Sequence, residues 1–235
     1  MTDHSGRTIL VTGASRGIGY AAAKHLAAEG AHVIAIARTQ GGLEDLDDEI
    51  KASGGQCTLV PMDLKDGDSI DRLGAALHER FGKLDGLLLN AGQLGSITPL
   101  PHIKPADYES VMSVNLTANY RLIRALDPLL RTSNAGRVVA VTSSVAQSHR
   151  AYWGVYAISK AGLEAMANIY ADETEVTSVR VNIYDPGGTR TAMRAKAVPG
   201  EDPTTLPDPA IHAENLSKLL SEDYVQSRRL VKFSA

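Results

Sequence analysis

Short apolar runs alternate with longer segments of helical periodicity along the chain. Runs such as Val138–Val141 are apolar throughout, which is typical of strands buried on both faces of a parallel sheet. The predicted strands are Thr8–Thr12, His32–Ala37, Cys57–Val60, Gly86–Asn90, Arg137–Thr142, Val179–Tyr184 and Leu230–Phe233. The predicted helices are Ile18–Glu29, Leu43–Ser53, Asp68–Phe81, Ala106–Arg131, Val155–Thr174 and Pro209–Ser221. This alternation predicts an α/β fold with a seven-stranded parallel sheet, right-handed crossovers and helices on both faces.

No internal repeat or low-complexity linker divides the chain into parts. The segment Val198–Pro209 carries four of the ten prolines and is predicted to be an irregular loop. Too few residues follow this loop to fold independently, so it does not mark a domain boundary. We therefore expect one doubly wound Rossmann domain over residues 1–235.

Composition and charge exclude several classes of function. The chain is 43% apolar and 22% charged with a net charge of -3, so no basic field attracts nucleic acid or an anionic membrane. One cysteine, Cys57, forms no internal disulfide, and the scattered histidines predict no metal site. The start of the chain, Met1–Arg7, lacks the apolar segment of a signal peptide, and no apolar run reaches membrane-spanning length. We therefore expect a cytoplasmic protein.

A glycine-rich turn, Thr12–Gly19 (TGASRGIG), joins the first predicted strand to the first predicted helix. Glycines permit a tight turn and close approach of a pyrophosphate to the free N–H groups at the helix start. Two alternatives are a turn that only packs the helix on the sheet and a hydrolase elbow of G-x-S-x-G form around Ser15. The elbow needs an oxyanion-hole loop from an earlier strand, and too few residues precede Gly13 to provide one. The context favours a dinucleotide site.

The end of the second predicted strand indicates which dinucleotide binds. NAD-binding proteins place an acidic residue there to hold the ribose hydroxyls. In this chain Arg38 follows His32–Ala37 instead, and Arg16 lies inside the glycine turn. Guanidinium groups form charge-assisted bonds to a 2′-phosphate. The two arginines therefore favour NADP(H) over NAD(H).

A tyrosine and a lysine form the candidate catalytic pair. Tyr156 and Lys160 are four residues apart in a predicted helix, so their side chains share one face. A nearby ammonium is expected to lower the phenol pKa from about 10 and to make the group a usable acid–base catalyst. Ser143 lies thirteen positions before Tyr156, at a strand end where its hydroxyl can hold the same substrate oxygen.

The same tyrosine–lysine spacing occurs a second time, at Tyr20 and Lys24. The residue thirteen positions before Tyr20 is Arg7, which offers no hydroxyl. This difference favours the pair of Tyr156 and Lys160.

The ordered motifs resemble those of the short-chain dehydrogenase/reductase (SDR) family, from Arg7 to about Ser221. They are Thr12-Gly13-x-x-x-Gly17-Ile18-Gly19, Asp63-Leu64, Asn90-Ala91-Gly92, Asn115, Ser143, Tyr156-x-x-x-Lys160 and Pro186-Gly187. The resemblance implies that Tyr156 acts as general acid/base, Ser143 orients the substrate, Lys160 tunes the tyrosine and bonds the nicotinamide ribose, and Asn115 holds a relay water. The implied cofactor-binding residues are Gly13, Ser15, Arg16, Gly17, Ile18, Gly19, Arg38, Asp63, Leu64, Asn90, Ala91, Gly92, Tyr156, Lys160, Pro186, Gly187, Thr189 and Thr191.

The resemblance implies an NADP(H)-dependent oxidoreductase that acts on a small-molecule carbonyl or alcohol substrate. It also implies a homodimer or homotetramer. A nucleotide-binding regulator of the same fold, without turnover, is the alternative. Two features depart from the family: Ser144 competes with Ser143 for the serine role, and the usual glycine-rich C-terminal ending is absent.

Three loops at the carboxyl ends of the strands are expected to form the substrate pocket. Their apolar residues are Leu94, Ile97, Val145, Tyr152, Trp153, Met193 and Val198. The charged residues that flank them are Arg150, Arg190, Arg194 and Lys196. The apolar set predicts a medium-sized, largely apolar ketone or aldehyde, whereas use of the arginines as an anchor would favour an anionic substrate.

Overall fold

A computed structural model describes residues 2–234 and contains one seven-stranded sheet with the order β3-β2-β1-β4-β5-β6-β7. The strands are β1 Thr8–Thr12, β2 His32–Ala37, β3 Gln56–Pro61, β4 Gly86–Leu89, β5 Arg137–Val141, β6 Arg180–Asp185 and β7 Leu230–Lys232. Every neighbouring pair is parallel. The predicted fold class is confirmed, and each predicted strand is present with small changes at its ends.

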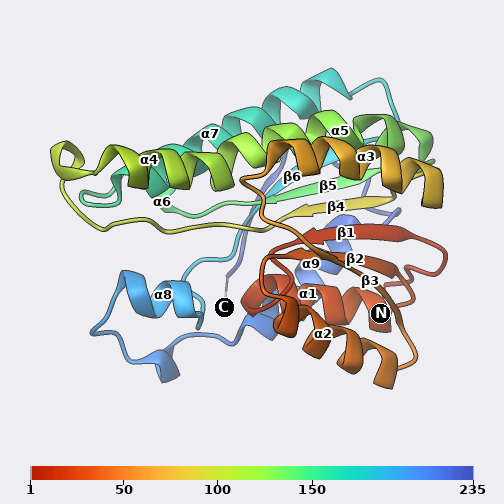
Figure 1. Cartoon of the computed structure of the whole chain (residues 1–235), viewed down its shortest axis with the longest axis horizontal. Coiled ribbons are helices and arrows are strands. Elements are labelled where there is room, and N and C mark those ends of the chain that lie inside the picture. Colours follow the sequence, from red (N-terminus) through yellow and green to blue (C-terminus); the bar gives the residue numbers. More distant parts are fainter. Residues whose placement is uncertain (1, 235) are drawn as a thin grey trace.

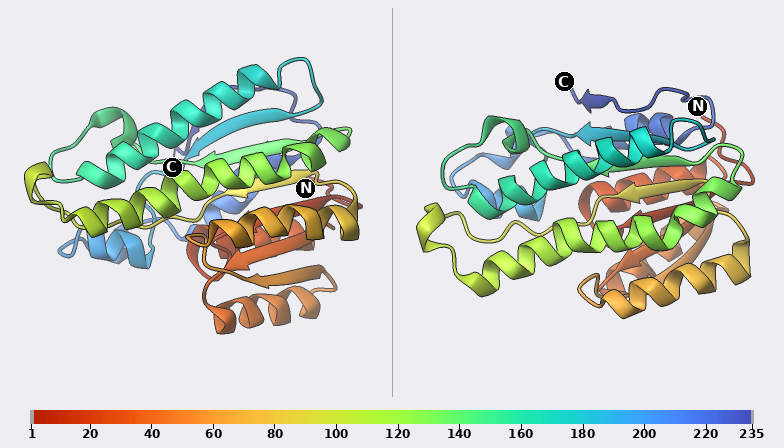
Figure 2. Two further views of the ribbon diagram at one scale, coloured as in Figure 1. Left: turned by 45° about the horizontal axis from the view of Figure 1, so that its top comes forward. Right: turned by 90° about the horizontal axis from the view of Figure 1, so that it is seen from above.

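Helices cover both faces of the sheet (Figure 1). They are α1 Gly17–Ala28, α2 Gln40–Ala52, α3 Gly67–Phe81, α4 Pro105–Met112, α5 Ala118–Thr132, α6 Val145–Ser148, α7 Gly154–Glu173, α8 Ala192–Ala197 and α9 Ala213–Leu220. Short 3-10 turns are η1 Leu100–His102, η3 Pro203–Thr205 and η4 Pro209–His212, and η2 Ser113–Thr117 is π-helical. Figure 2 shows α3, α5 and α7 side by side on one face, with α1, α2 and α9 on the other.

Each face of the sheet has its own apolar core. Side chains of α5 and α7, such as Leu122 and Leu163, pack against Leu10, Leu87 and neighbouring strand residues. On the opposite face, α1 and α9 pack against strand residues that point the other way, such as Val11. Alternate residues of a central strand therefore enter different cores, as the two-residue period of a strand requires. This double burial explains why the strands are apolar throughout.

The strand order reverses direction between β1 and β4. Leu10 of β1 is in register with Ile34 of β2 on one side and with Leu87 of β4 on the other. In open parallel sheets, ligands bind outside the carboxyl ends of the strands at such a switch point. The glycine turn follows β1 and Asn90 follows β4, so the predicted cofactor motifs meet at this point.

The helix predicted over Ala106–Arg131 is present and runs from Pro105 to Thr132, but it is not α-helical throughout. The π-helical turn η2 separates α4 from α5 and contains Asn115. Single π turns within helices occur frequently at functional sites. The loops after β5 and β6 also contain two short helices that were not predicted, α6 and α8, and the predicted helix Pro209–Ser221 begins as the 3-10 turn η4.

Within residues 2–234, no helix has both the length and the apolar content needed to cross a bilayer. In the same part of the chain, no group of three or more His, Cys, Asp or Glu side chains is placed to hold a metal ion.

Candidate active site

The glycine turn packs so closely on the end of β4 that its key positions have no room for a side chain. Gly13 has φ +70°, and a Cβ there would lie 2.9 Å from the Cα atom of Ala91. A Cβ on Gly19 would lie 2.4 Å from Asn90 Nδ2 and 2.4 Å from the Gly13 carbonyl oxygen. These contacts hold the start of α1 close to the carboxyl end of β1, and the first N–H groups of a helix have no partner within it. The geometry fits a pyrophosphate group.

Hydrogen bonds join this turn to the β4 end. The Thr12 hydroxyl accepts hydrogen bonds from the backbone N–H groups of Asn90 and Ala91, both at 3.0 Å. It donates a hydrogen bond to the Leu88 carbonyl at 3.1 Å. The Asn90 amide nitrogen donates to the Thr12 carbonyl at 2.9 Å. The Asn90 side chain therefore braces the turn, and the backbone of the Asn90-Ala91-Gly92 motif is left to form a cavity wall.

A cavity of about 460 Å³ lies at the switch point, within the range of small-molecule sites. The predicted residues that line it are Gly13, Ser15, Arg16, Gly17, Ile18, Arg38, Asp63, Leu64, Asn90, Ala91, Gly92, Ser143, Tyr156, Lys160, Pro186, Gly187, Thr189 and Thr191. Two predicted residues are not in its wall: Gly19, which packs beneath the turn, and Asn115, which is fully buried. Motifs distant in the sequence thus form one continuous surface.

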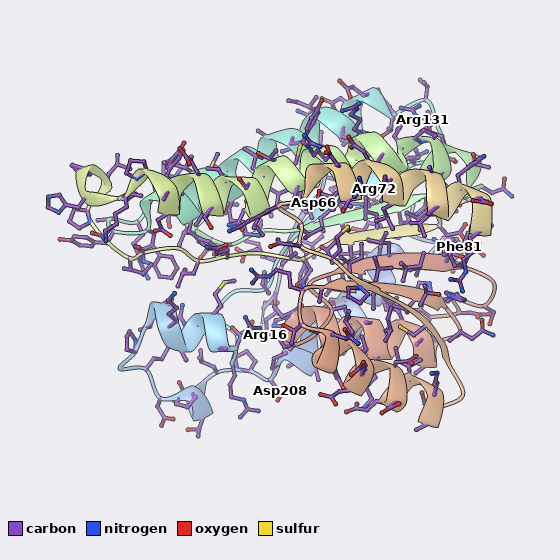
Figure 3. The ribbon with its side chains drawn as sticks, in the orientation of Figure 1. Arg16, Asp66, Arg72, Phe81, Arg131 and Asp208 are labelled. Carbon is purple, nitrogen blue, oxygen red and sulfur yellow. The ribbon has the colours of Figure 1, made fainter. Side chains whose placement is uncertain are left out.

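One end of the cavity is cationic. The exposed side chains of Arg16 and Arg38 line it together with Thr39 and Asp63. Figure 3 shows Arg16 at the start of α1, at the end of the sheet where α8 lies. Leu64, which is buried, adds an apolar surface beside them. Two guanidinium groups beside an apolar wall fit the adenosine 2′-phosphate of NADP(H).

Tyr156 and Lys160 lie at the other end, on one face of α7. The Lys160 ammonium is buried, donates to the Val141 carbonyl at 2.7 Å, and lies 5.8 Å from the centre of the Tyr156 ring. Ser143 follows β5 and lines the cavity, whereas Ser144 is exposed and does not. Of the two candidate serines, the structure brings Ser143 to the tyrosine.

Burial dominates the protonation of the pair. It raises the pKa of Tyr156 to about 12, although hydrogen bonding with Ser143 acts in the lowering direction. Burial also lowers the pKa of Lys160 to about 8, and the nearby Glu164 carboxylate opposes that change. The expected lowering of the phenol pKa by the ammonium is therefore not produced by these protein groups alone. Near neutral pH the phenol keeps its proton and is available as an acid.

Asn115 braces the cavity from behind. Its Oδ1 accepts the Gln93 N–H at 2.7 Å, while its Nδ2 donates to the Gln93 carbonyl and the Ser159 hydroxyl, both at 2.9 Å. The Asn119 side chain donates to the Asn115 carbonyl at 2.7 Å. The asparagine thus ties the π-helical turn to the loop after β4 and to α7. Its predicted part in a water relay stays a prediction.

Sequence reasoning missed several of these supporting groups. Thr142 lines the cavity, and its hydroxyl donates to Glu164 at 2.6 Å. Glu164 follows Lys160 by one helical turn, so the i, i+4 spacing was the available signal. Gln93 directly follows the Asn90-Ala91-Gly92 motif, but nothing in the sequence indicates that it holds Asn115.

The second tyrosine–lysine pair has a different setting. Lys24 pairs with Glu49 of α2 at 2.7 Å. Burial and hydrogen bonding to the same carboxylate raise the pKa of Tyr20 to about 12. Neither residue lines the cavity. This pair fastens α1 to α2, in agreement with the choice of Tyr156 and Lys160.

Beside Tyr156 the cavity wall becomes apolar. Leu94, Trp153 and Met193 line it, and Val145 and Val198 belong to the same apolar cluster. Two predicted pocket residues, Ile97 and Tyr152, lie at the surface instead, with exposed fractions of 39% and 59%.

The charged residues near this wall are mostly neutralised or distant. Arg194 forms a two-point ion pair with Glu201, with both N–O distances at 2.5 Å. Arg190 donates to Asp208 at 2.6 Å. Arg150 and Lys196 are exposed and do not line the cavity. The structure therefore presents a pocket of little net charge beside the tyrosine.

The sequence model of the short chain dehydrogenases matches residues 7–202. The chain belongs to this family. It is thus an SDR oxidoreductase, and the resemblance drawn from the ordered motifs is confirmed. The oxidoreductase YciK of Escherichia coli K12 is 42% identical over 207 residues, which cover 87% of this chain and 82% of YciK.

Solved structures show the same arrangement of the chain. A crystal structure of yciK from E. coli has a TM-score of 0.93 at 39% identity and covers 97% of this SDR and 95% of that chain. A short chain dehydrogenase from Shigella flexneri 2a, solved in complex with NADP, has a TM-score of 0.94 at 38% identity and covers 99% of both chains. A short chain dehydrogenase from E. coli CFT073, solved in complex with NADPH, has a TM-score of 0.91 at 38% identity. The match covers 97% of this SDR and 96% of that chain.

Proposed function

We propose that this SDR is an NADP(H)-dependent reductase of ketones or aldehydes that also oxidises the corresponding alcohols. The observation that carries the proposal is the arrangement of one cavity: two arginines at one end, and Ser143, Tyr156 and Lys160 at the other. A cationic end suits a phosphorylated nucleotide, and a protonated phenol beside a hydroxyl suits a carbonyl oxygen. The two ends are parts of the same surface, as hydride transfer between cofactor and substrate requires.

Several residues would hold the cofactor. The glycine turn and the start of α1 provide backbone N–H groups for the pyrophosphate, and Arg16 and Arg38 provide charge for the 2′-phosphate. The NADP and NADPH complexes of the Shigella and E. coli proteins support this choice. When bound, NADPH supplies the hydride. NAD(H) lacks the phosphate that the two arginines favour, so we propose weaker binding of that cofactor.

The protein groups supply the acid–base chemistry. In the reducing direction, the Tyr156 O–H donates its proton to the substrate oxygen as that oxygen gains electrons, and the Ser143 hydroxyl donates a hydrogen bond to the same atom. The resulting phenolate is stabilised by the nearby Lys160 ammonium. The Val141 carbonyl accepts a hydrogen bond from that ammonium, and Asn115 holds the neighbouring Ser159 of α7. In the oxidising direction the phenolate takes the proton back from the alcohol.

The substrate is proposed to be medium-sized and largely apolar. Leu94, Trp153 and Met193 offer apolar surface next to Tyr156. Because Arg194 is already paired with Glu201, binding a substrate carboxylate there would require breaking a two-point ion pair. An apolar carbonyl compound needs no such exchange. Among the described residues no histidine lines the cavity, so the hydrolase alternative at Ser15 lacks a general base.

The proposal is tested by monitoring the absorbance of NADPH as it is oxidised in the presence of a panel of carbonyl compounds. The panel contains simple ketones, aldehydes and diketones of increasing apolar size, and small keto acids. We expect turnover that rises with apolar size and is lost in Tyr156→Phe. NADPH binding without turnover of any compound would favour the non-catalytic regulator. Preference for small keto acids would show that the arginines anchor the substrate.

A further inference from the structure

His212 is a fully buried histidine next to the cavity, and it is not part of the site described above. It ends the 3-10 turn η4 and precedes α9. Its Nδ1 lies 2.9 Å from the Tyr184 hydroxyl of β6, and its Nε2 lies 2.8 Å from the Thr189 hydroxyl. Edge-to-face contacts with Tyr184 at 5.8 Å and Phe233 at 4.7 Å hold the ring. Both ring nitrogens are therefore engaged, and the ring is fixed by packing.

The direction of these two hydrogen bonds follows from their chemistry. Burial lowers the pKa of His212 to about 4, so near pH 7 the neutral ring has one donor and one acceptor nitrogen. Burial also raises the pKa of Tyr184, although its side-chain hydrogen bond with Asn215 opposes the change, and the phenol keeps its proton. A phenol is a stronger donor than an aliphatic alcohol. Tyr184 therefore donates to Nδ1, and the Nε2–H donates to the Thr189 oxygen.

Because the Thr189 oxygen accepts the Nε2–H of His212, the hydroxyl proton of Thr189 is free to bond to a different acceptor. Its nearest protein acceptor is the Pro186 carbonyl at 3.4 Å, which is long for a bond between oxygen atoms. Thr189 is almost completely buried but lines the cavity, between Gly187 and Arg190. An acceptor in the cavity can therefore compete well for this proton. The phosphate and carboxamide oxygens of a nicotinamide nucleotide are such acceptors.

We propose that His212 is a positioning residue for the cofactor: with Tyr184, it fixes the Thr189 hydroxyl as a hydrogen-bond donor to an acceptor oxygen of NADPH. The proposal rests on the NADP(H) site of the proposed function. His212 itself lies behind Thr189, does not line the cavity, and acts only through the threonine.

A second buried histidine provides a matched control. His4 is also fully buried, and its Nε2 lies 3.0 Å from the hydroxyl of Ser217 in α9. His4 precedes β1 and thus lies at the opposite end of the sheet from the cavity. Both histidines contact the α9 region, but only His212 contacts a residue of the cavity wall. A merely structural histidine should affect stability and leave cofactor binding unchanged.

The test measures the NADPH dissociation constant by fluorescence titration and the melting temperature of the cofactor-free protein. We expect His212→Leu to weaken NADPH about 5-fold, as loss of one oriented hydrogen bond predicts. His212→Gln, which can still donate to Thr189, should recover most of this loss. Tyr184→Phe should weaken NADPH less, and His4→Leu should lower the melting temperature without changing the dissociation constant. Unchanged NADPH affinity in both His212→Leu and Tyr184→Phe would overturn the proposal.

A double-mutant cycle then tests the route of the effect. In a Thr189→Val background, His212→Leu should weaken NADPH no further, because the hydroxyl that it orients is gone. An undiminished 5-fold effect in that background would overturn the proposal. Nitrogen NMR of the His212 ring is a second readout that survives if His212→Leu fails to fold, since we expect the proton on Nε2. A proton on Nδ1 would contradict the proposed order of donors.

The wild-type titration separates this inference from the proposed function. Saturable NADPH binding with no effect of the His212 and Tyr184 variants would refute the positioning role alone. No saturable binding of NADPH to the wild-type protein would refute the cofactor assignment, and with it the inference.

Discussion

The two ends of the sheet use similar polar residues in opposite ways. At the amino end, the buried Arg7 guanidinium donates to the carbonyls of Asp85, Ala135 and Leu220 at 2.9–3.1 Å. Arg137, also buried, donates to the Ser221 and Glu222 carbonyls at 3.1 and 2.6 Å.

At the carboxyl end, by contrast, Arg16, Arg38 and Ser143 face a cavity. The two arginines at the amino end thus bond to carbonyls of the protein itself, whereas those at the carboxyl end line the cavity, where we propose that they bind the cofactor. The same residue types therefore serve the stability of the fold in one place and the proposed binding in the other. Substitutions at the two ends should separate these properties.

The largest effect is expected at the carboxyl end. Tyr156→Phe removes the proposed proton donor but keeps the aromatic ring, so turnover should fall by a factor of about 10²–10⁴. The NADPH dissociation constant and the melting temperature should change little, because the hydroxyl is not needed for the fold. Steady-state kinetics and a binding titration check both parts. Near-normal turnover would show that another group is the acid.

Ser143→Ala should raise the activation barrier by about 2.7–4 kcal/mol, if the hydroxyl stabilises the developing charge as an oxyanion donor does. Ser144→Ala is the matched control, since Ser144 is exposed and outside the cavity wall. Its kcat should stay within about twofold of the wild type, a shift of only ~0.4 kcal/mol. A larger loss in Ser144→Ala than in Ser143→Ala would reverse the assignment.

At the amino end, Asp85→Ala should lower the free energy of unfolding by about 3 kcal/mol, because it removes one partner of a buried charged network. The Asp85 carboxylate accepts the Thr8 N–H at 2.9 Å and the Ser133 hydroxyl at 2.5 Å. Lys83→Met serves as control: this lysine is about half exposed, so its ion pair with Asp85 should contribute less than ~1 kcal/mol. Denaturant titration measures the free energy of unfolding of both variants. A change in NADPH affinity of folded Asp85→Ala would contradict the separation of the two ends.

The smallest predicted effect concerns cofactor choice. Arg38→Asp removes the proposed charge-assisted bond to the 2′-phosphate, worth ~1.5–3 kcal/mol, so NADPH should bind about 10- to 100-fold more weakly while NADH binds more tightly. Arg150→Asp makes the same charge change at an exposed arginine outside the cavity wall and should leave both affinities nearly unchanged. Equal affinities of the wild-type protein for NADPH and NADH would contradict the role of the arginines.

Local sequence patterns predicted the fold and much of the candidate site. The strands were predictable because a strand buried on both faces needs an unbroken apolar run, and β1 and β2 have their predicted bounds. The pairing of Tyr156 with Lys160 was predictable because helical spacing alone places them on one face. In each case the information lies within a few consecutive residues.

Features that depend on the path of the chain were not predictable. Ser113–Thr117 has no local signal that separates a π-helical turn from a continuous helix. Arg194 pairs with Glu201 only because the loop after α8 folds back toward that helix. The partners of His212 are Tyr184 in β6 and Thr189 in the segment that follows β6. The pKa of Tyr156 also depends on tertiary burial, which the tyrosine–lysine spacing does not report.

The contact at Gly19 constrains how this protein can evolve. Alanine is the smallest possible replacement, yet its methyl group would lie 2.4 Å from both Asn90 Nδ2 and the Gly13 carbonyl oxygen. Asn90 also holds the Thr12 carbonyl, so it cannot move away without loosening the turn. No single substitution therefore offers a gradual route away from glycine. A lineage that leaves this position must rebuild the turn and the β4 end together, or give up the nucleotide.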